Sequence, residues 1–184
     1  MFEIKDGWLM GVEHCPSPHF NQRPSADDIS LLVIHNISLP PGKFGSNHIS
    51  QLFLGQLDPT DDPYFVDIYQ LQVSAHCLVR RDGSIIQYVS FNDKAWHAGV
   101  SSYCGREKCN DFSIGIELEG TDSIPYTNIQ YQQLVCLVKK LQEYYPLISH
   151  NHLVGHCDIA PGRKTDPGES FDWHYFKSLL NQSK

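Results

Sequence analysis

The sequence predicts an α/β fold in a single domain, with a central mixed β-sheet flanked by helices. Two short apolar runs, LLVIH at Leu31–His35 and SIGIEL at Ser113–Leu118, have the composition of strands that are buried on both faces. A β-hairpin pattern lies between them, and a long amphipathic helical pattern follows the second run. A chain of 184 residues suits one domain by the usual prior of about 100–200 residues. We therefore expect one domain over residues 1–184.

The first half of the chain is expected to supply a buried strand, a short helix and a hairpin. Leu31–His35 is the buried strand, and Ser46–Leu54 is predicted to form a short helix with its apolar residues on one side. Ala75–Arg80 and Ser84–Val89 flank the dipeptide Asp82-Gly83. Both residues of that dipeptide tolerate a positive φ, which favours a tight hairpin turn.

The second half of the chain carries the clearest helix of the sequence. Thr127 and Gln130 have the spacing of a capping box. An apolar stripe at helical spacing follows, formed by Leu134, Leu137, Val138 and Leu141. Pro146 is expected to end this helix. Beyond it, we expect a long loop over Ser149–Glu169 and a closing helix over Phe171–Leu180.

Charge and hydropathy exclude two classes of partner. The formal net charge is -7, so the chain lacks the basic footprint of a nucleic-acid binder. No apolar stretch approaches the ~18 residues that a membrane span needs. The N-terminal segment carries Glu3, Asp6 and Glu13 and no apolar core of a signal peptide. We therefore expect a cytoplasmic protein, a monomer, with no nucleic-acid or membrane partner and with free thiols.

Three residues are candidate ligands of a metal ion. His35 ends a buried strand, while His156 in GHCD and Asp166 in KTDPG lie in a polar loop. A catalytic zinc takes three such ligands and keeps one position open. The spacing alone is a weak indication, because an HExxH motif is absent and other ligand types lie nearby, namely His76, His97, Cys157 and Asp158. The CxxxxC pair Cys104 and Cys109 also leaves a redox pair or a second metal site open.

Five long segments resemble one enzyme family. They are LLVIHNISLPPG, VSAHCLVRRDGSIIQYV, KAWHAGVS, CNDFSIGIELEG and GHCDIAPGRKTDPG. Together they are similar to the bacterial cytosolic 1,6-anhydro-N-acetylmuramoyl-L-alanine amidases, within the wider family of zinc amidases and peptidoglycan-recognition proteins. The resemblance runs from about Trp8 to about Trp173. It implies a mixed sheet with helices on it and a Zn²⁺ ion on the floor of a groove, held by His35, His156 and Asp166.

The resemblance also implies two catalytic residues, Glu117 and Lys164. In a strand, Glu117 alternates with its apolar neighbours and points to the opposite face, where a carboxylate is costly unless it is paired or functional. It is the candidate general base, and Glu119, on the same face, is the second choice. Lys164 lies two residues before Asp166 and could stabilise a developing oxyanion. The alternative for Lys164 is a solvated loop lysine.

The substrate that the resemblance implies is a muropeptide, in which anhydro-N-acetylmuramic acid is joined through its lactyl group to L-Ala-D-Glu-diaminopimelate. Asn36 could hydrogen-bond a peptide carbonyl, Trp96 could stack on the sugar, and Ala160 matches a position that lines the peptide site. Lys108 stands where the family usually has an arginine that holds the diaminopimelate carboxylate. A lysine is a point charge and not a bidentate fork, so this contact is expected to be looser.

The function expected from these residues is zinc-dependent amide hydrolysis in cytosolic peptidoglycan recycling. By removing muropeptides that signal for β-lactamase, such an enzyme would affect β-lactamase induction indirectly. Two alternatives are kept: a non-catalytic muropeptide-binding module and an amidase that acts on intact cell wall. The presence of all three candidate metal ligands, together with Glu117 and Lys164, argues against the binding module.

Overall fold

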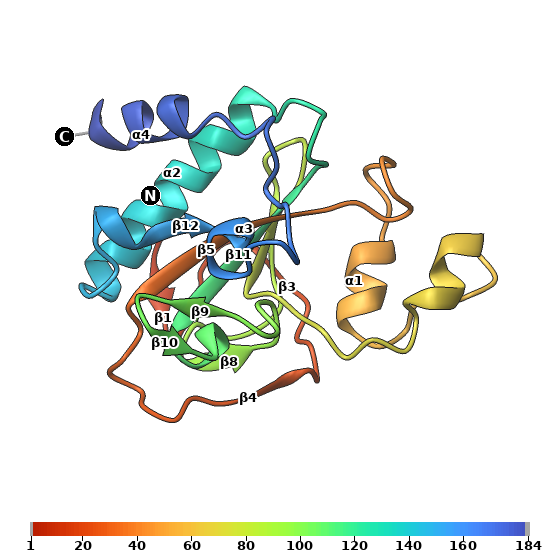
Figure 1. The fold of residues 1–184 in the computed structure, drawn as a ribbon, viewed down its shortest axis with the longest axis horizontal. Helices are drawn as coiled ribbons and strands as arrows, with labels where there is room; N and C mark the ends of the chain where they lie inside the picture. Colours follow the sequence, from red (N-terminus) through yellow and green to blue (C-terminus); the bar gives the residue numbers. More distant parts are fainter. Residues whose placement is uncertain (1, 183–184) are drawn as a thin grey trace.

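A six-stranded mixed sheet forms the centre of the computed structural model, which describes residues 2–182 (Figure 1). The strand order is β12-β5-β11-β6-β7-β3. The strands are β12 (Leu153–Gly155), β5 (Leu31–Ile37), β11 (Ser113–Glu119), β6 (Cys77–Val79), β7 (Ile85–Gln87) and β3 (Glu13–His14). Neighbours are parallel except β6 and β7, which form an antiparallel hairpin. The predicted mixed sheet, with its two apolar runs at the centre, is confirmed.

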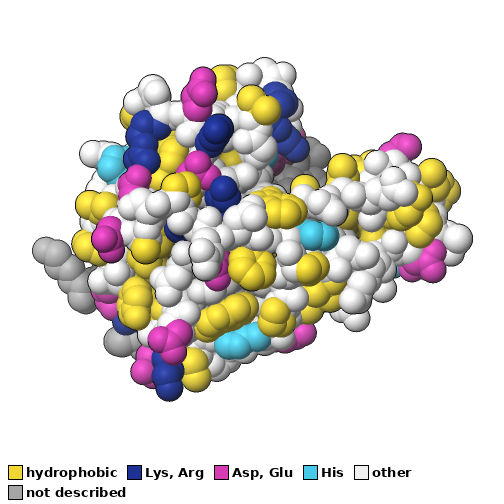
Figure 2. All heavy atoms as spheres, turned by 90° about the horizontal axis from the view of Figure 1, so that it is seen from below, with side chains coloured by type: hydrophobic (Ala, Val, Ile, Leu, Met, Phe, Trp, Pro, Cys, Tyr) yellow, Lys and Arg dark blue, Asp and Glu magenta, His cyan; other side chains and the backbone are white. Residues whose placement is uncertain are grey.

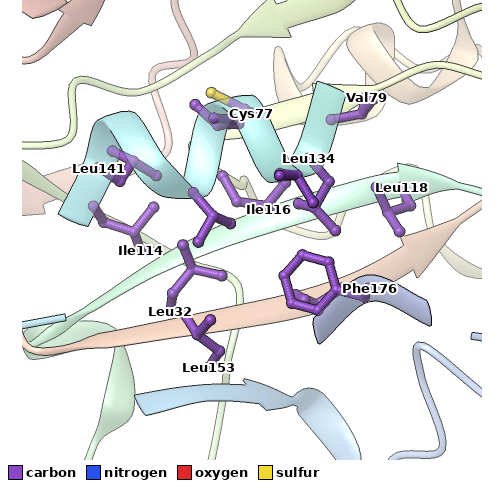
Figure 3. Close-up of a cluster of buried hydrophobic side chains, with 14 of the residues drawn as sticks. Leu32, Cys77, Val79, Ile114, Ile116, Leu118, Leu134, Leu141, Leu153 and Phe176 are labelled. Atoms are coloured by element: carbon purple, nitrogen blue, oxygen red, sulfur yellow. The ribbon is translucent and has the colours of Figure 1, made fainter. Parts of the chain in front are cut away.

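Two helices, α2 (Asn128–Tyr144) and α4 (Trp173–Gln182), lie together on one face of the sheet (Figure 1). The capping box at Thr127 and Gln130 is present, and the predicted apolar stripe of α2 is buried. Figure 3 shows how apolar side chains of β11 meet α2 and Phe176 of α4. Hydrophobic burial on this face therefore fixes the sheet and both helices as one unit. No helix within residues 2–182 combines the length and the apolar character that a membrane crossing requires.

The other face of the sheet carries short elements and a projecting lobe. The lobe holds α1 (His48–Phe53) and the 3₁₀ helix η1 (Pro63–Asp67), and it stands apart from the body in Figure 1. A second apolar cluster with Phe65 and Tyr88 at its centre anchors the lobe to the sheet. The remaining short elements are β1 (Ile4–Lys5), β2 (Trp8–Leu9), β4 (Phe20–Gln22), β8 (Asp93–Ala95), β9 (Ser102–Tyr103), β10 (Arg106–Glu107), η2 (Cys109–Asp111), η3 (His150–His152) and α3 (His156–Ile159).

Three local expectations need correction. The segment predicted as one long loop contains η3, β12 and α3, which are each too short to give a periodic pattern. The closing helix begins at Trp173 and not at Phe171. In the hairpin turn only Gly83 has a positive φ, and its N–H donates to the carbonyl of Arg80. Asp82 keeps a negative φ, because a three-residue hairpin loop needs one left-handed residue.

Candidate metal centre and active-site cavity

His35, His156 and Asp166 meet at one edge of the central sheet. His35 lies in β5, and His156 directly follows β12, which runs parallel to β5 and beside it. Parallel neighbours bring their C-terminal ends to the same edge, so the two imidazoles meet. The Nδ1 atoms of the two histidines lie 3.0 Å apart. Asp166 Oδ2 lies 3.0 Å from Nδ1 of His35 and 3.1 Å from Nδ1 of His156.

This donor set fits a divalent metal ion such as zinc. Ligand atoms that share one ion at roughly 2.0–2.1 Å in tetrahedral geometry lie roughly 3.3 Å apart, and the three separations here are close to that. Burial lowers the pKa of His35 to about 4, so its imidazole is neutral, as metal binding requires. Burial works to raise the pKa of Asp166, but hydrogen bonds with His156 and His35 hold it below its usual value. Two imidazoles and one carboxylate are a usual catalytic zinc set.

The other candidate ligands lie elsewhere. Within residues 2–182, the three residues above are the one group of His, Cys, Asp or Glu side chains whose ligand atoms converge in this way. The Asp158 carboxylate accepts the N–H of Gly155 and so caps α3. The ring of His97 touches the far side of His35, and His76 is packed behind His97. Cys104, Cys109 and Cys157 are free thiols.

A cavity of about 710 Å³ opens above these three residues. Its floor is polar and includes the three candidate ligands together with Asn36 and Glu117. Its far wall is apolar and comes mostly from the lobe, with Leu52, Phe53, Tyr64, Ile68 and Leu71. Hydrophobic side chains cover much of the lobe surface in Figure 2, and Tyr64, Val66 and Leu71 are exposed there. The cavity can therefore accommodate a ligand that is polar on one side and apolar on the other.

Glu117 and Glu119 point to the same face of β11 but have opposite environments. The Oε2 atom of Glu117 is buried and has no hydrogen-bond partner. Burial raises the pKa of this carboxyl well above its usual value, the charge of Asp166 raises it further, and Lys164 opposes the shift. The Glu119 carboxylate accepts N–H groups from Gly45 at 2.5 Å and Arg81 at 3.0 Å. Glu119 therefore joins two loops, whereas Glu117 keeps an acceptor oxygen free beside the candidate metal ligands.

Three further predicted site residues line the same cavity. Lys164 is exposed at its rim. Asn36 follows His35 and donates from Nδ2 to Asp122 Oδ1 at 2.8 Å. Trp96 donates from Nε1 to Asn21 Oδ1 at 2.8 Å, and its ring is stacked on that of His19 with 5.8 Å between centroids. Trp96 is thus a fixed part of the cavity wall.

Lys108 and Ala160 line a second cavity of about 560 Å³. Arg163 borders both cavities, and its guanidinium donates to the carbonyls of Ala98 and Val100 at 2.7 Å. The structure therefore divides the predicted substrate contacts into two groups. One group surrounds the candidate metal ligands, and the other lies beyond Arg163.

The sequence does not predict the groups that contact the outward-facing Nε2 atoms of the two candidate ligand histidines. Nε2 of His35 lies 2.9 Å from Nδ1 of His97, and Nε2 of His156 lies 3.1 Å from the carbonyl oxygen of Ala98. From the sequence alone, His97 is only an alternative candidate ligand. Its position in the segment KAWHAGVS was the one available indication, because nothing in the spacing links it to His35.

Comparison with known proteins gives a consistent result. The model of the N-acetylmuramoyl-L-alanine amidase family matches residues 25–169. The 1,6-anhydro-N-acetylmuramyl-L-alanine amidase AmpD of Citrobacter freundii is 59% identical over 180 residues, which cover 98% of this chain and 96% of the relative. A crystal structure of a selenomethionine AmpD derivative has a TM-score of 0.94 at 59% identity and covers 97% of this chain and 99% of its own.

A more distant solved structure contains a substrate. It is the N-acetylmuramyl-L-alanine amidase AmiD from Escherichia coli, in complex with anhydro-N-acetylmuramic acid-L-Ala-D-γ-Glu-L-Lys. Its TM-score is 0.59 at 29% identity, over 97% of this chain and 65% of its own.

Proposed function

The chain belongs to the N-acetylmuramoyl-L-alanine amidase family, and from this membership we propose that it hydrolyses the amide bond between 1,6-anhydro-N-acetylmuramic acid and L-alanine in muropeptides. The chain is thus a hydrolase of peptidoglycan recycling, and residues 1–184 form one amidase domain. The observation that carries the proposal is the unpartnered carboxylate of Glu117 in the cavity that also holds three converging metal ligands. A buried, unpaired carboxylate is unfavourable for folding, which argues for a catalytic role.

The metal in this proposal is zinc, held by His35 Nδ1, His156 Nδ1 and Asp166 Oδ2. When bound, zinc supplies Lewis acidity that activates water and polarises a carbonyl at neutral pH. The neutral imidazole of His35 and the ionised Asp166 are the protonation states that such a site needs.

Glu117 is the general base of the proposed reaction. Its free Oε2 accepts a proton from the attacking water, and the same carboxyl then gives that proton to the leaving nitrogen of L-alanine. A raised pKa brings a carboxyl nearer to the operating pH, where it can both accept and return a proton. The Lys164 ammonium, at the rim of the same cavity, stabilises the negative charge that develops on the carbonyl oxygen.

The two cavities suggest how the substrate lies. The sugar and the lactyl group occupy the first cavity, with Trp96 stacked on the sugar and Asn36 bonded to a peptide carbonyl. The peptide then passes Arg163 to the second cavity, where Ala160 lines its path and Lys108 meets the carboxylate of diaminopimelate. The complex of AmiD with an anhydromuropeptide supports this class of ligand.

The cellular setting is part of the proposal. Six free thiols suit a reducing compartment, so we place the enzyme in the cytoplasm. There it removes muropeptides and so lowers the induction of β-lactamase. A monomer without a nucleic-acid or membrane partner stays a prediction.

Zinc content and turnover of an anhydromuropeptide test the proposal together. His35→Ala and His156→Ala are expected to lose both zinc and activity, because each removes one of three ligands. His150→Ala is the matched control, since this histidine is exposed on η3, outside the cluster, and should keep both. Full zinc content and full activity in either ligand variant would disprove the assignment. Zinc binding without turnover would favour a binding module, and faster turnover of intact cell wall would indicate a different substrate.

A further inference from the structure

The dipeptide His97–Ala98, between β8 and β9, lies behind both ligand histidines. The side chain of His97 contacts His35, with 2.9 Å between His97 Nδ1 and His35 Nε2. The main chain of Ala98 contacts His156, with 3.1 Å between the Ala98 carbonyl oxygen and His156 Nε2. One short segment thus contacts the Nε2 atoms of both imidazoles, which face away from the candidate metal site.

These contacts determine which nitrogen of each ligand faces the metal site. A carbonyl oxygen only accepts, so the contact with Ala98 is a hydrogen bond only when His156 has its N–H on Nε2, and in the neutral ring that tautomer leaves Nδ1 as the acceptor. His35 must do the same if its Nδ1 is to bind a metal, because a neutral imidazole has one N–H. Its Nε2–H then donates to Nδ1 of His97. His97 in turn carries its own proton on Nε2, which lies 3.1 Å from Ser113 Oγ.

The dipeptide is itself held tightly. Asn110 Oδ1 accepts both of its backbone N–H groups, from His97 at 3.1 Å and from Ala98 at 2.8 Å. The ring of His97 lies against Gly115 of β11, where a Cβ atom would approach the His97 ring to 2.4 Å. Any residue other than glycine at this position would displace the ring. The position of His97 is therefore determined by Asn110 on one side and by the surface of β11 on the other.

We propose that His97 is a positioning residue for the metal centre, which fixes His35 in the tautomer whose Nδ1 binds the metal, and that Asn110 holds His97 in place. This inference rests on the metal site of the proposed function. It assigns roles to two residues that are not ligands. The partners of ligand histidines in other metalloproteins change metal affinity about 10- to 100-fold when they are removed.

Zinc affinity, measured by competition with a chelator, is the first test. His97→Phe keeps a ring but removes the acceptor, and Asn110→Leu removes the acceptor for the two N–H groups. Both are expected to weaken zinc binding about 10- to 100-fold. Asn110→Asp keeps an acceptor oxygen and is expected to stay within about threefold of the wild type, which a loss of general stability would not explain. His152→Phe, on η3, is the matched control and should bind zinc as the wild type does.

Nitrogen-15 spectra of the zinc-loaded wild type are the second test and need no variant to fold. The expected result is His97 in the Nε2–H tautomer and a through-hydrogen-bond coupling between His35 Nε2 and His97 Nδ1. The finding of His97 as the Nδ1–H tautomer would overturn the inference. Zinc affinities of His97→Phe and Asn110→Leu equal to that of the wild type would also overturn it. A wild type that binds no zinc would instead refute the metal site of the proposed function.

Discussion

The two faces of β11 have contrasting roles in this molecule. On one face Ile114, Ile116 and Leu118 are buried against α2 and α4 (Figure 3). On the other face, Glu117 and Glu119 point toward the cavity side of the sheet. The first face contributes stability through apolar burial, whereas the second introduces buried carboxylates, which oppose folding unless they are compensated. A single seven-residue strand therefore contributes both to the core and to the floor of the cavity that holds the candidate metal ligands.

The two carboxylates of the polar face, Glu117 and Glu119, differ in their hydrogen-bond partners. Glu119 is fully used by two backbone N–H groups. Glu117, two residues away, is buried with an oxygen that has no partner. In a native structure an unpaired buried polar group calls for an explanation, and a catalytic role is one of the explanations. The comparison therefore supports the proposal that Glu117 is the general base, whereas Glu119 holds two backbone N–H groups.

The largest effect is expected from Glu117→Gln. It should keep zinc and fold but lower kcat by about 10²–10⁴, because an amide cannot act as a general base. Turnover of an anhydromuropeptide and metal analysis of the same sample measure both properties. Glu119→Gln is the matched control on the same face, and it should retain most of the activity. A near wild-type kcat for Glu117→Gln would move the catalytic role to another group.

The apolar face is tested by Ile116→Ala. The side chain is fully buried between the sheet and α2, so its truncation should lower the free energy of unfolding by about 2–5 kcal/mol. Urea unfolding of the zinc-loaded protein measures this change. Ile129→Ala, at a partly exposed position of α2, should cause a much smaller loss. Equal losses at the two positions would mean that this face is not the main source of stability.

Lys164→Ala should lower kcat by about 10²–10³ and leave zinc content unchanged. The reason is that its ammonium meets a charge that develops only in the transition state. Steady-state kinetics separate this role from binding, since a loss confined to KM would make Lys164 a substrate-binding residue. Lys164→Arg keeps the charge and should recover part of the rate.

The sequence predicted the apolar face well. The runs at β5 and β11, the capping box of α2 and its buried stripe follow from local periodicity, and each is present in the structure. The periodicity of apolar residues did not predict β12 and α3, because three or four residues are too few to show a period. β12 is held by its pairing with β5, which is a long-range contact, and α3 follows β12 directly.

The polar face was harder to predict from the residues alone. Spacing did not distinguish His156 from Asp158 or His35 from His97, and the family resemblance supplied the choice. That choice agrees with the one converging group in residues 2–182. No sequence pattern predicted the division of the proposed substrate contacts by Arg163 or the contacts of His97–Ala98 with both candidate ligands. Both depend on how the loops after β8 and α3 meet.

A smaller effect concerns how the free energy of unfolding depends on pH, to which Glu117 on the polar face of β11 contributes. Since burial raises the pKa of Glu117, the native metal-free protein holds a proton that the unfolded chain has released above roughly pH 4.3. Stability is therefore lost as pH rises toward the folded pKa. Glu117→Gln has no carboxyl to ionise at this position and does not lose stability in this way. The free energy of unfolding of Glu117→Gln minus that of the wild type should therefore increase as pH rises. Glu3→Gln removes one negative charge at an exposed position and is the control for that loss of charge. A difference between Glu117→Gln and the wild type that stays constant across pH would contradict the prediction.

The smallest effect concerns Lys108, on the far side of Arg163 from the metal ligands. If its ammonium meets the diaminopimelate carboxylate, a peptide without diaminopimelate should be a poorer substrate for the wild type but nearly as good as the full stem for Lys108→Ala. Both changes delete the same interaction, so their effects on kcat/KM are not additive. Because Lys108 is exposed, the coupling should be only about 0.2–1 kcal/mol and should shrink with added salt. Lys108→Arg should bind the full stem at least as well, since a guanidinium can engage a carboxylate through two hydrogen bonds. Strictly additive losses would mean that Lys108 is a solvated charge and that the carboxylate is held elsewhere in the second cavity.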